Sequence, residues 1–334
     1  MIRGLSLILC GVLFALPGCA SESQIASPAT APREAKTSPA GEPIEPQATS
    51  LLGTPLYPPA LSQEVSHARE QDLYEAQLAY DHDLHDETAI IWLGRRQAYL
   101  GEYRAAIDTF SNGLAILPES VRLLRHRGHR YITLREFDKA IADLSRALEL
   151  IDAGAIPDEI EPDGQPNARN IPTSTLHTNI FYHLGLAHYL RGEWEAAASA
   201  YRRCLDAAGN DDMRVAAAYW LFLSLMRAGQ TSDAQAVLRS ISSEMAIIEN
   251  DSYRKLLLVF KDELDPQTLQ PGEGVANDAS IDLATIGYGL GVRDLIHGGT
   301  AAAEARFREI IANTNWAAFG HIAAEAELAR IQAR

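Results

Sequence analysis

The sequence is poor in cysteine, in aromatic residues and in positive charge. Only 3 of its 334 residues are cysteine, and one of them lies within the first ten residues, which excludes a disulfide framework. Aromatic residues make up 7% of the chain. The 29 Lys and Arg residues are outnumbered by 44 Asp and Glu residues, so the net charge is −15. Because nucleic acids are bound by clustered Lys and Arg, this balance disfavours a nucleic-acid-binding protein.

Signatures of catalysis and of metal binding are also absent. The chain has no Gly-x-Ser-x-Gly, no Walker motif and no His-Glu-x-x-His. His82 and His85 lie among acidic residues, but no Cys or further His accompanies them at a ligand spacing. We therefore predict no enzymatic activity, no cofactor and no metal site. An enzyme with an unrecognised site is the least favoured of the functions considered.

The only long apolar run lies at the N-terminus. Arg3 precedes an apolar stretch over 5–16, which is followed by small residues. This order is that of a secretory signal peptide, and the run is too short to span a bilayer comfortably. The sequence thus predicts a signal peptide over 1–18 and an exported protein.

The end of this signal carries a second motif, Leu16-Pro17-Gly18-Cys19. It resembles the lipobox of bacterial lipoproteins, which implies a diacylglyceryl group on Cys19, cleavage before this residue and acylation of the new amine. Residue 20 is Ala rather than Asp, so the inner-membrane retention signal of enteric bacteria is missing. The resemblance implies an outer-membrane lipoprotein that faces the periplasm; the alternative is ordinary cleavage and release.

A proline-rich segment follows Cys19. Half of the 16 prolines lie between residues 20 and 62, separated mostly by small polar residues. Such a segment buries too little apolar surface to offset its chain entropy. We predict a disordered tether over 19–62, with a reach of roughly 35–40 Å if it behaves as a flexible chain.

The rest of the chain repeats one pattern with a period of 34 residues. Four of the five copies have Gly at the eighth position, all five have Ala at the twentieth, and large residues recur at the fourth, seventh, eleventh and twenty-fourth. Small residues let two helices approach closely, and Gly at the fifteenth position supplies the turn between them. The copies span 87–120, 121–154, 178–211, 215–248 and 284–317.

These copies resemble tetratricopeptide repeats. The resemblance implies an all-α protein, a right-handed superhelix (α-solenoid) of about five helix–turn–helix repeats with capping helices over 63–334. We expect one capping helix over 63–80 and another within 318–331. An extra helix is expected over 249–264, and a Pro-rich and Gly-rich loop follows it to about residue 278.

Tetratricopeptide superhelices bind partners along a concave groove lined by the first helix of each repeat. The resemblance places in this groove Arg95, Arg122, Arg125, His126, His129, Tyr182, His183, Tyr219 and Trp220. The stretch 122–135 contains five Arg, two His and no acid, an unusual excess in an acidic protein. We expect a cationic patch beside an aromatic wall, since Arg recognises carboxylates through its planar fork. The alternative is a solvated helix face whose Arg residues pair with nearby acids.

The insertion over 155–177, between the second and third repeats, is acidic. It holds four carboxylates between residues 158 and 163 against the single basic residue Arg169. Long loops without structure are usually functional or disordered. One hypothesis is that the insertion folds over the groove and screens the Arg-rich helix as an intramolecular ligand. The alternative is that it packs at the repeat junction or hangs in solvent.

Together these features predict a membrane-tethered scaffold or adaptor in the bacterial cell envelope. It would bind partner proteins or peptides, with anionic segments among them, through the concave groove. An alternative is an outer-membrane protein assembly factor that receives client peptide segments. Partner, pathway and oligomeric state are not determined by these residues, because a repeat motif specifies a fold rather than a ligand.

Overall fold

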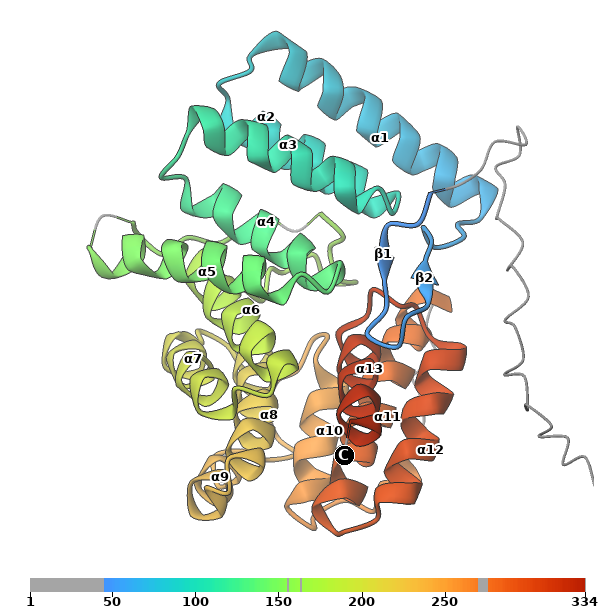
Figure 1. The fold of residues 1–334 in the computed structure, drawn as a ribbon. Coiled ribbons are helices and arrows are strands. Elements are labelled where there is room, and N and C mark those ends of the chain that lie inside the picture. Colours follow the sequence, from blue (N-terminus) through green and yellow to red (C-terminus); the bar gives the residue numbers. More distant parts are fainter. Residues whose placement is uncertain (1–44, 155, 163, 270–275, 334) are drawn as a thin grey trace, which may run out of the picture. The chain divides into compact units, whose positions relative to one another are not determined.

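The structure is a computed structural model that describes residues 45–154, 156–162, 164–269 and 276–333. The predicted signal peptide and Cys19 lie outside the described residues. The described part contains thirteen α-helices, a short antiparallel pair of strands and one 3₁₀ turn (Figure 1). These elements are β1 (Ala48–Thr49), β2 (Pro55–Leu56), α1 (Gln63–His82), α2 (Glu87–Tyr99), α3 (Tyr103–Ile116), α4 (Val121–Thr133), α5 (Phe137–Asp152), α6 (Leu176–Arg191), α7 (Trp194–Ala207), α8 (Asp211–Arg227), α9 (Thr231–Leu238), α10 (Asp251–Phe260), the 3₁₀ turn (Pro266–Thr268), α11 (Ala276–Ile296), α12 (Thr300–Asn313) and α13 (Phe319–Gln332).

Consecutive helices pack as pairs: α2 with α3, α4 with α5, α6 with α7, α8 with α9, and α11 with α12. Side-chain caps fix where several first helices begin. Asp86 accepts a hydrogen bond from the Thr88 amide at the start of α2, and Ser120 accepts one from the Leu123 amide at the start of α4. These caps satisfy amides that have no partner inside the helix.

The turn inside each pair needs one residue with positive φ. Gly101 has φ +85° in the first pair, and three other pairs also place Gly at this fifteenth position. The second pair has Arg135 there instead, with φ +65°. A residue with a Cβ is strained in this region, so other contacts of Arg135 must offset the cost.

Each repeated glycine lies where two helices of a pair touch. A Cβ added to Gly185 would lie 2.8 Å from the Tyr201 ring, which is too close for two carbon atoms. The same eighth-to-twenty-fourth contact joins Gly94 to Phe110, Gly128 to Leu144, and Gly291 to Phe307. The alanine at the twentieth position is completely buried in all five pairs. The predicted all-α solenoid of tetratricopeptide type is therefore confirmed in its fold class.

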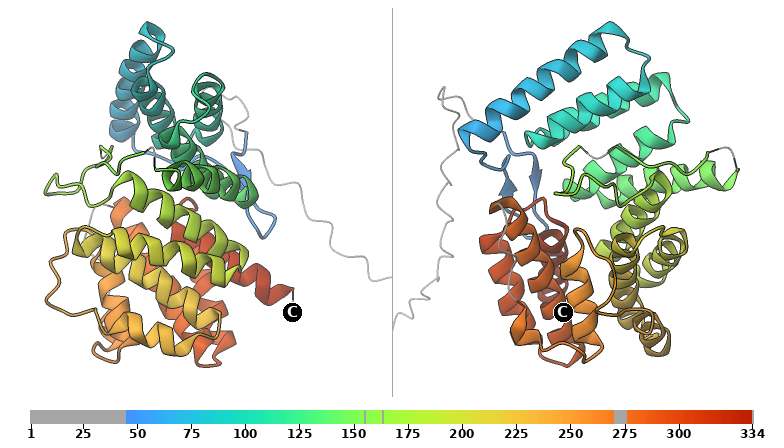
Figure 2. Two further views of the ribbon diagram at one scale, coloured as in Figure 1. Left: turned by 90° about the vertical axis from the view of Figure 1, so that its left-hand side faces the viewer. Right: turned by 180° about the vertical axis from the view of Figure 1, so that it is seen from behind.

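The regular stacking of pairs changes after α9. Helix α10 packs mainly on α8 and α11 rather than on α9, and α13 packs on α11, α12 and also on α6. In Figures 1 and 2 the orange and red helices α10–α13 consequently lie beside α6 and α8 instead of extending the stack. The last repeat and its cap therefore return to the first helices of earlier repeats.

Two buried ion-pair clusters hold the returning helix α13. Arg135 Nη2 lies 2.6 Å from Glu325 Oε1, and the same nitrogen donates to the Trp316 carbonyl oxygen at 2.8 Å. Glu327 Oε1 on α13 lies 2.6 Å from Arg227 Nη1 and 2.9 Å from Arg330 Nη1. Charges buried in this way need such pairing, because an unpaired charge in the interior is costly.

The segment 45–62 differs from the disordered tether that its composition predicts. It contains β1 and β2 and buries Ala48 and Leu56. The Leu51 amide donates to Glu325 Oε2 at 3.2 Å, and Trp316 Nε1 donates to the Tyr57 carbonyl at 2.7 Å. The many prolines of this segment predicted disorder. The segment also contains apolar residues that become buried, and its backbone contacts α13 and the loop before it. The remainder of the predicted tether lies outside the described residues.

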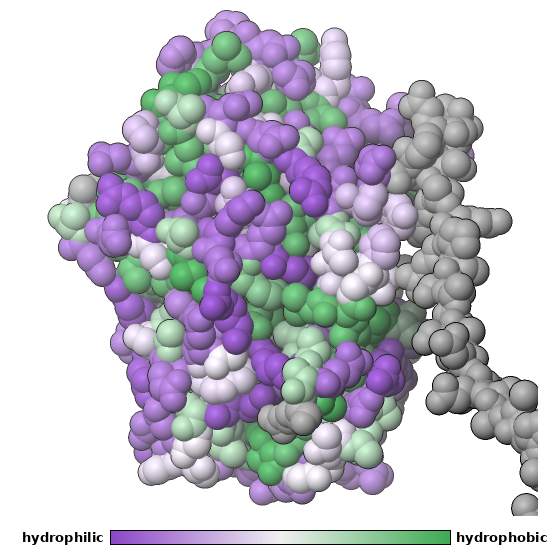
Figure 3. Space-filling view, viewed as in Figure 1, coloured by the Kyte–Doolittle hydropathy of each residue, from purple (hydrophilic) through white to green (hydrophobic). Residues whose placement is uncertain are grey.

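The surface of the described part mixes polar and apolar residues. On the face drawn in Figure 3, hydrophilic and hydrophobic residues are interspersed rather than gathered into one broad apolar area. None of the helices in the described ranges combines the length and apolar character that a membrane crossing requires.

Candidate functional site

Helices α2, α4, α6 and α8 are the first helices of their repeats, and together they form what we call the first-helix face. Neighbouring members of this set contact each other. The first two repeats contribute Arg95 on α2 and four predicted residues on α4, namely Arg122, Arg125, His126 and His129. The tertiary structure brings Arg95, Arg125, His126 and His129 to the wall of one cavity between α2 and α4.

The insertion lies across this part of the first-helix face. Arg122 Nε lies 3.4 Å from Glu159 Oε1, and Arg125 Nε lies 3.0 Å from Glu161 Oε2. Arg95 Nη1 donates to the Pro162 carbonyl oxygen at 2.7 Å. An acidic, extended segment of the chain is therefore bound to the predicted cationic patch, as the intramolecular-ligand hypothesis expects.

Among the described acids of the insertion, Glu161 is the most buried, with 7% of its surface exposed. Its Oε1 lies 3.4 Å from His126 Nε2, and Asn179 Nδ2 on α6 donates to its Oε2 at 2.6 Å. Burial acts to raise the pKa of this carboxyl, but Arg125, His126 and Asn179 together hold the pKa well below its usual range. Glu161 is thus a carboxylate bound by two basic side chains and an amide.

The ends of the insertion are fixed to α6 and to the loop before α10. The Leu176 amide donates to the Glu159 carbonyl oxygen at 2.8 Å. Asn167 Nδ2 donates to Glu249 Oε2 at 3.0 Å, and Thr173 also donates to the Glu249 carboxylate. The described parts of the insertion are therefore anchored on both sides of Glu161 and do not hang in solvent.

The aromatic wall expected in an open groove is buried instead. Tyr182 is 8% exposed, and Tyr219 and Trp220 are at most 1% exposed. Trp220 Nε1 donates to Tyr182 Oη at 2.7 Å, and the Tyr219 ring lies 4.9 Å from that of Tyr253 on α10. Because α10 and α11 cover α6 and α8, these aromatic residues belong to the core and offer no surface to a ligand in this structure.

His129 and His183 meet each other inside the molecule. Their ring centroids are 4.2 Å apart, and Phe319 of α13 lies 5.4 Å from His129 and 5.7 Å from His183. Burial and the nearby Arg125 lower the pKa of His183 to about 3, while burial and Arg130 place the pKa of His129 well below its usual value. Both imidazoles are therefore neutral at pH 7, and His183, 4% exposed, is a core residue rather than a groove residue.

Two contacts of the site were not predicted. Asn179 on α6 donates a hydrogen bond to Glu161 of the insertion, and Arg130 lines the same cavity as Arg125. If the helix face were simply solvated, Arg127 and Arg130 would both point away from the groove and pair with nearby acids. Arg127 does pair with Asp143, at 2.7 Å, but Arg130 lines the cavity between α2 and α4.

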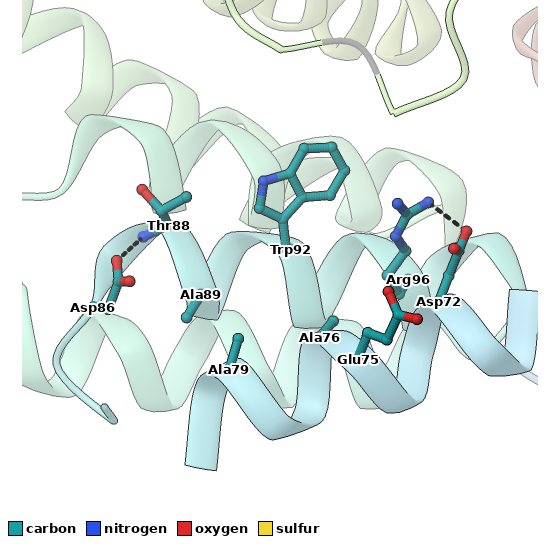
Figure 4. A pocket seen from close by; sticks show the side chains of 9 residues that line it. All are labelled: Asp72, Glu75, Ala76, Ala79, Asp86, Thr88, Ala89, Trp92 and Arg96. Atoms are coloured by element: carbon teal, nitrogen blue, oxygen red, sulfur yellow. Dashed lines mark hydrogen bonds and ion pairs between the residues drawn. The ribbon is translucent and has the colours of Figure 1, made fainter. Parts of the chain in front are cut away.

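A second pocket, of about 260 Å³, lies between α1 and α2 (Figure 4). Trp92 and three alanines form its apolar part, and its charged residues are three acids and Arg96. Arg96 Nη1 is 2.9 Å from Asp72 Oδ2, so this cation is already neutralised. The pocket is unsuited to an anionic ligand. Within the described residues, no three His, Cys, Asp or Glu side chains are grouped to hold a metal ion.

The helix pairs, the left-handed turn residues and the contacts between the eighth and twenty-fourth positions define an α-solenoid of helix–turn–helix units. With their period of 34 residues, these units have the fold of tetratricopeptide repeats.

Comparisons with known proteins give low similarity. No protein-family model and no curated protein matches the chain. Among solved structures, YrrB, "a TPR protein with an unusual peptide-binding site", is 14% identical; the match covers 75% of this chain and 95% of that chain, with a TM-score of 0.40. PilW, a type IV pilus biogenesis factor, is 18% identical, with coverages of 75% and 94% and a TM-score of 0.41. A tetratricopeptide repeat protein from Parabacteroides merdae is 14% identical, with coverages of 79% and 99% and a TM-score of 0.43.

Proposed function

We propose that this chain is a protein-interaction scaffold, tethered to a membrane of the bacterial cell envelope, that binds acidic extended segments of partner proteins. The observation that supports this most directly is the segment 158–162 on α2 and α4. It provides one example of an acidic peptide held on the first-helix face by Arg95, Arg122 and Arg125. A partner segment with the same chemistry would use the same guanidinium groups.

The energetics favour acidic partners over neutral ones. Hydrogen bonds from Arg to a carboxylate are charge-assisted and stronger than those between neutral groups. The insertion is part of the same chain, so its effective concentration at the site is high and a partner must compete with it. Binding would therefore strengthen when the hold of the insertion weakens, and it would weaken as salt screens the charges.

We expect the change Glu161→Gln to raise the affinity for an added acidic peptide by about tenfold to a hundredfold. A hydrogen bond to a charged group contributes about 1.5–3 kcal/mol, and each 1.4 kcal/mol corresponds to a factor of ten. The probe is a fluorescent peptide with the sequence of residues 156–162, and fluorescence anisotropy with the full-length chain measures its binding. Glu119→Gln is the matched control, because it removes the same charge from an exposed side chain.

Two results would contradict this proposal. The peptide could bind the Glu161→Gln chain no better than the parent chain, or its binding could survive the further change Arg125→Glu. A peptide with Gln in place of its own Glu161 should bind more weakly, because it lacks the carboxylate that Arg125 and His126 contact.

The membrane tether has its own test. We expect Cys19→Ser to abolish the incorporation of a labelled fatty acid into the protein, because the thiol that would carry the lipid is gone. Cys10→Ser is the matched control, since Cys10 lies inside the predicted signal and should leave anchoring unchanged. If the Cys19→Ser chain still takes up the labelled fatty acid, or the parent chain takes up none, a lipid anchor on Cys19 is ruled out and the scaffold function must stand without it.

A further inference from the structure

A cavity of about 130 Å³ lies between α2 and α4, next to the place where Glu161 binds. Its lining contains three guanidinium groups, two imidazoles and no carboxylate. The lining residues are Arg95, Ala98, Tyr99, Phe110, Arg125, His126, His129 and Arg130. Arg95 and Arg125 also line a smaller cavity of about 100 Å³ on the side of the insertion, which includes Glu161. We call the 130 Å³ space the arginine cavity. It is lined by cationic side chains and shares Arg95 and Arg125 with the smaller cavity next to Glu161.

The arginines of α4 differ in how their charges are neutralised. Arg122 pairs with Glu87 and Glu159, Arg125 with Glu161, and Arg127 with Asp143. Among the described residues, no acid lies within ion-pair distance of Arg130, whose nearest recorded partner is the Tyr103 ring at 5.6 Å.

Arg95 also lacks a carboxylate partner in the described part of the chain. Its guanidinium donates to the Pro162 carbonyl and to Tyr99 Oη, which are both neutral acceptors. Two of the three guanidinium groups around the cavity therefore keep an uncompensated positive charge.

The electrostatics of the cavity reflect this excess. Burial, together with the like charges of Arg125 and Arg95, lowers the pKa of Arg130 to about 10, although Tyr103 and Tyr99 oppose the shift. Burial and Arg125 lower the pKa of His126 to about 3, although Glu161 opposes the shift. A partly buried cation without a counterion is unfavourable, and an anion that enters this space would relieve that cost.

We propose that the arginine cavity binds one oxyanion group, a carboxylate or a phosphate, between Arg95, Arg125 and Arg130. The planar fork of Arg matches both groups, and the cavity volume fits a group of a few heavy atoms. The neutral imidazole of His129 and the hydroxyl of Tyr99 are further potential donors. This inference deepens the proposed function, since the oxyanion could belong to a bound partner segment, but anion binding itself does not depend on any partner.

The test uses small anions and the full-length chain. Thermal unfolding is followed at constant ionic strength and pH in sodium chloride, sodium acetate and sodium phosphate. We expect acetate or phosphate to raise the melting temperature relative to chloride, and isothermal titration to give a saturable 1:1 binding curve. A stronger effect of acetate identifies a carboxylate ligand, and a stronger effect of phosphate identifies a phosphate ligand; either supports the cavity.

Variants separate this site from general salt effects. Arg130→Gln should weaken anion binding at least tenfold, while Arg104→Gln, which removes an exposed cation from α3, should leave it unchanged. In chloride, Arg130→Gln should not lower the melting temperature, because it removes a partly buried charge that has no acid partner among the described residues. If Arg130→Gln does not fold, Arg95→Gln provides the same comparison. Asp163 follows Pro162, whose carbonyl oxygen binds Arg95, so its carboxylate could compete with an added anion. The titration is therefore repeated on the Asp163→Asn chain, which lacks this carboxylate.

The proposal is overturned if acetate and phosphate stabilise the parent and Asp163→Asn chains no more than chloride does. It is also overturned if the anion effect is unchanged in both Arg130→Gln and Arg95→Gln. Failure of the peptide-binding experiment together with saturable phosphate binding would reject the scaffold function and leave the cavity intact. Successful peptide binding without saturable binding of acetate or phosphate would reject anion binding in the cavity and leave the scaffold function intact.

Discussion

Replacing Arg135 with Ala is expected to lower the free energy of unfolding by about 3–5 kcal/mol, the usual cost of breaking a buried ion pair. Arg135 and Glu325 have side chains that are 3% and 1% exposed, and they join the turn after α4 to α13 across 190 residues of sequence. The alanine chain would leave the Glu325 carboxylate buried with fewer partners. It would also keep the strained positive φ at position 135. Urea unfolding followed by circular dichroism measures the change.

Two further variants separate the ion pair from the backbone strain. Arg135→Gly should be less harmful than Arg135→Ala by about 1 kcal/mol, because Gly adopts positive φ without penalty and occupies this position in the four other repeats. Arg146→Ala on α5 is the control: its ion pairs with Glu119 and Glu149 are exposed, and surface pairs contribute about 0–1 kcal/mol. A loss below about 1 kcal/mol for Arg135→Ala would show that this contact does not hold α13.

Lowering the pH from 7.5 to 5.5 is expected to reduce the free energy of unfolding by about 4 kcal/mol, of which each of three histidines with a lowered pKa contributes about a third. The pKa values of His126 and His183 are lowered to about 3 and that of His129 is also well below the usual 6.5. Between pH 7.5 and 5.5 these histidines therefore become protonated in the unfolded chain but stay neutral in the folded chain. The contribution of these neutral histidines to the free energy of unfolding is fully present above about pH 6.5 and is lost as the pH falls toward 3.

The cause of these low pKa values can be tested by substitution. The imidazoles face Arg125, Arg130, the carboxylate of Glu161 and the ring of Phe319, and burial is the largest influence on each. Urea unfolding at several pH values should show a smaller pH dependence for His183→Gln. The exposed His67→Gln should behave like the parent chain. A stability that stays constant between pH 7.5 and 5.5 would mean that water reaches these histidines.

The repeat architecture was predictable because its rules are local. The close contact of Gly94 with Phe110 and of Gly185 with Tyr201 joins residues 16 positions apart, so a pattern in the sequence records it directly. The same holds for the turn residue at the fifteenth position. Even the exception, Arg135, is visible in the sequence as a missing glycine, but its partner Glu325 is not.

The candidate site was predictable only in part. The resemblance to tetratricopeptide repeats predicted that Arg95, Arg125, His126 and His129 share a groove, and the structure brings them to one cavity. The acidic composition of the insertion suggested an intramolecular ligand, and Glu161 does lie against Arg125. The same resemblance placed Tyr182, His183, Tyr219 and Trp220 on the first-helix face. It could not show that later helices cover them.

The sequence by itself therefore determined the helix pairs, their turns and the cationic character of α4, because these depend on residues within one period of 34. Only the tertiary structure decided which part of the first-helix face is open. That outcome depends on α10, α11 and α13 returning to α6 and α8, and on a single acidic segment crossing α2 and α4. Such contacts join segments that are far apart in sequence, follow no period and are each worth only a few kcal/mol.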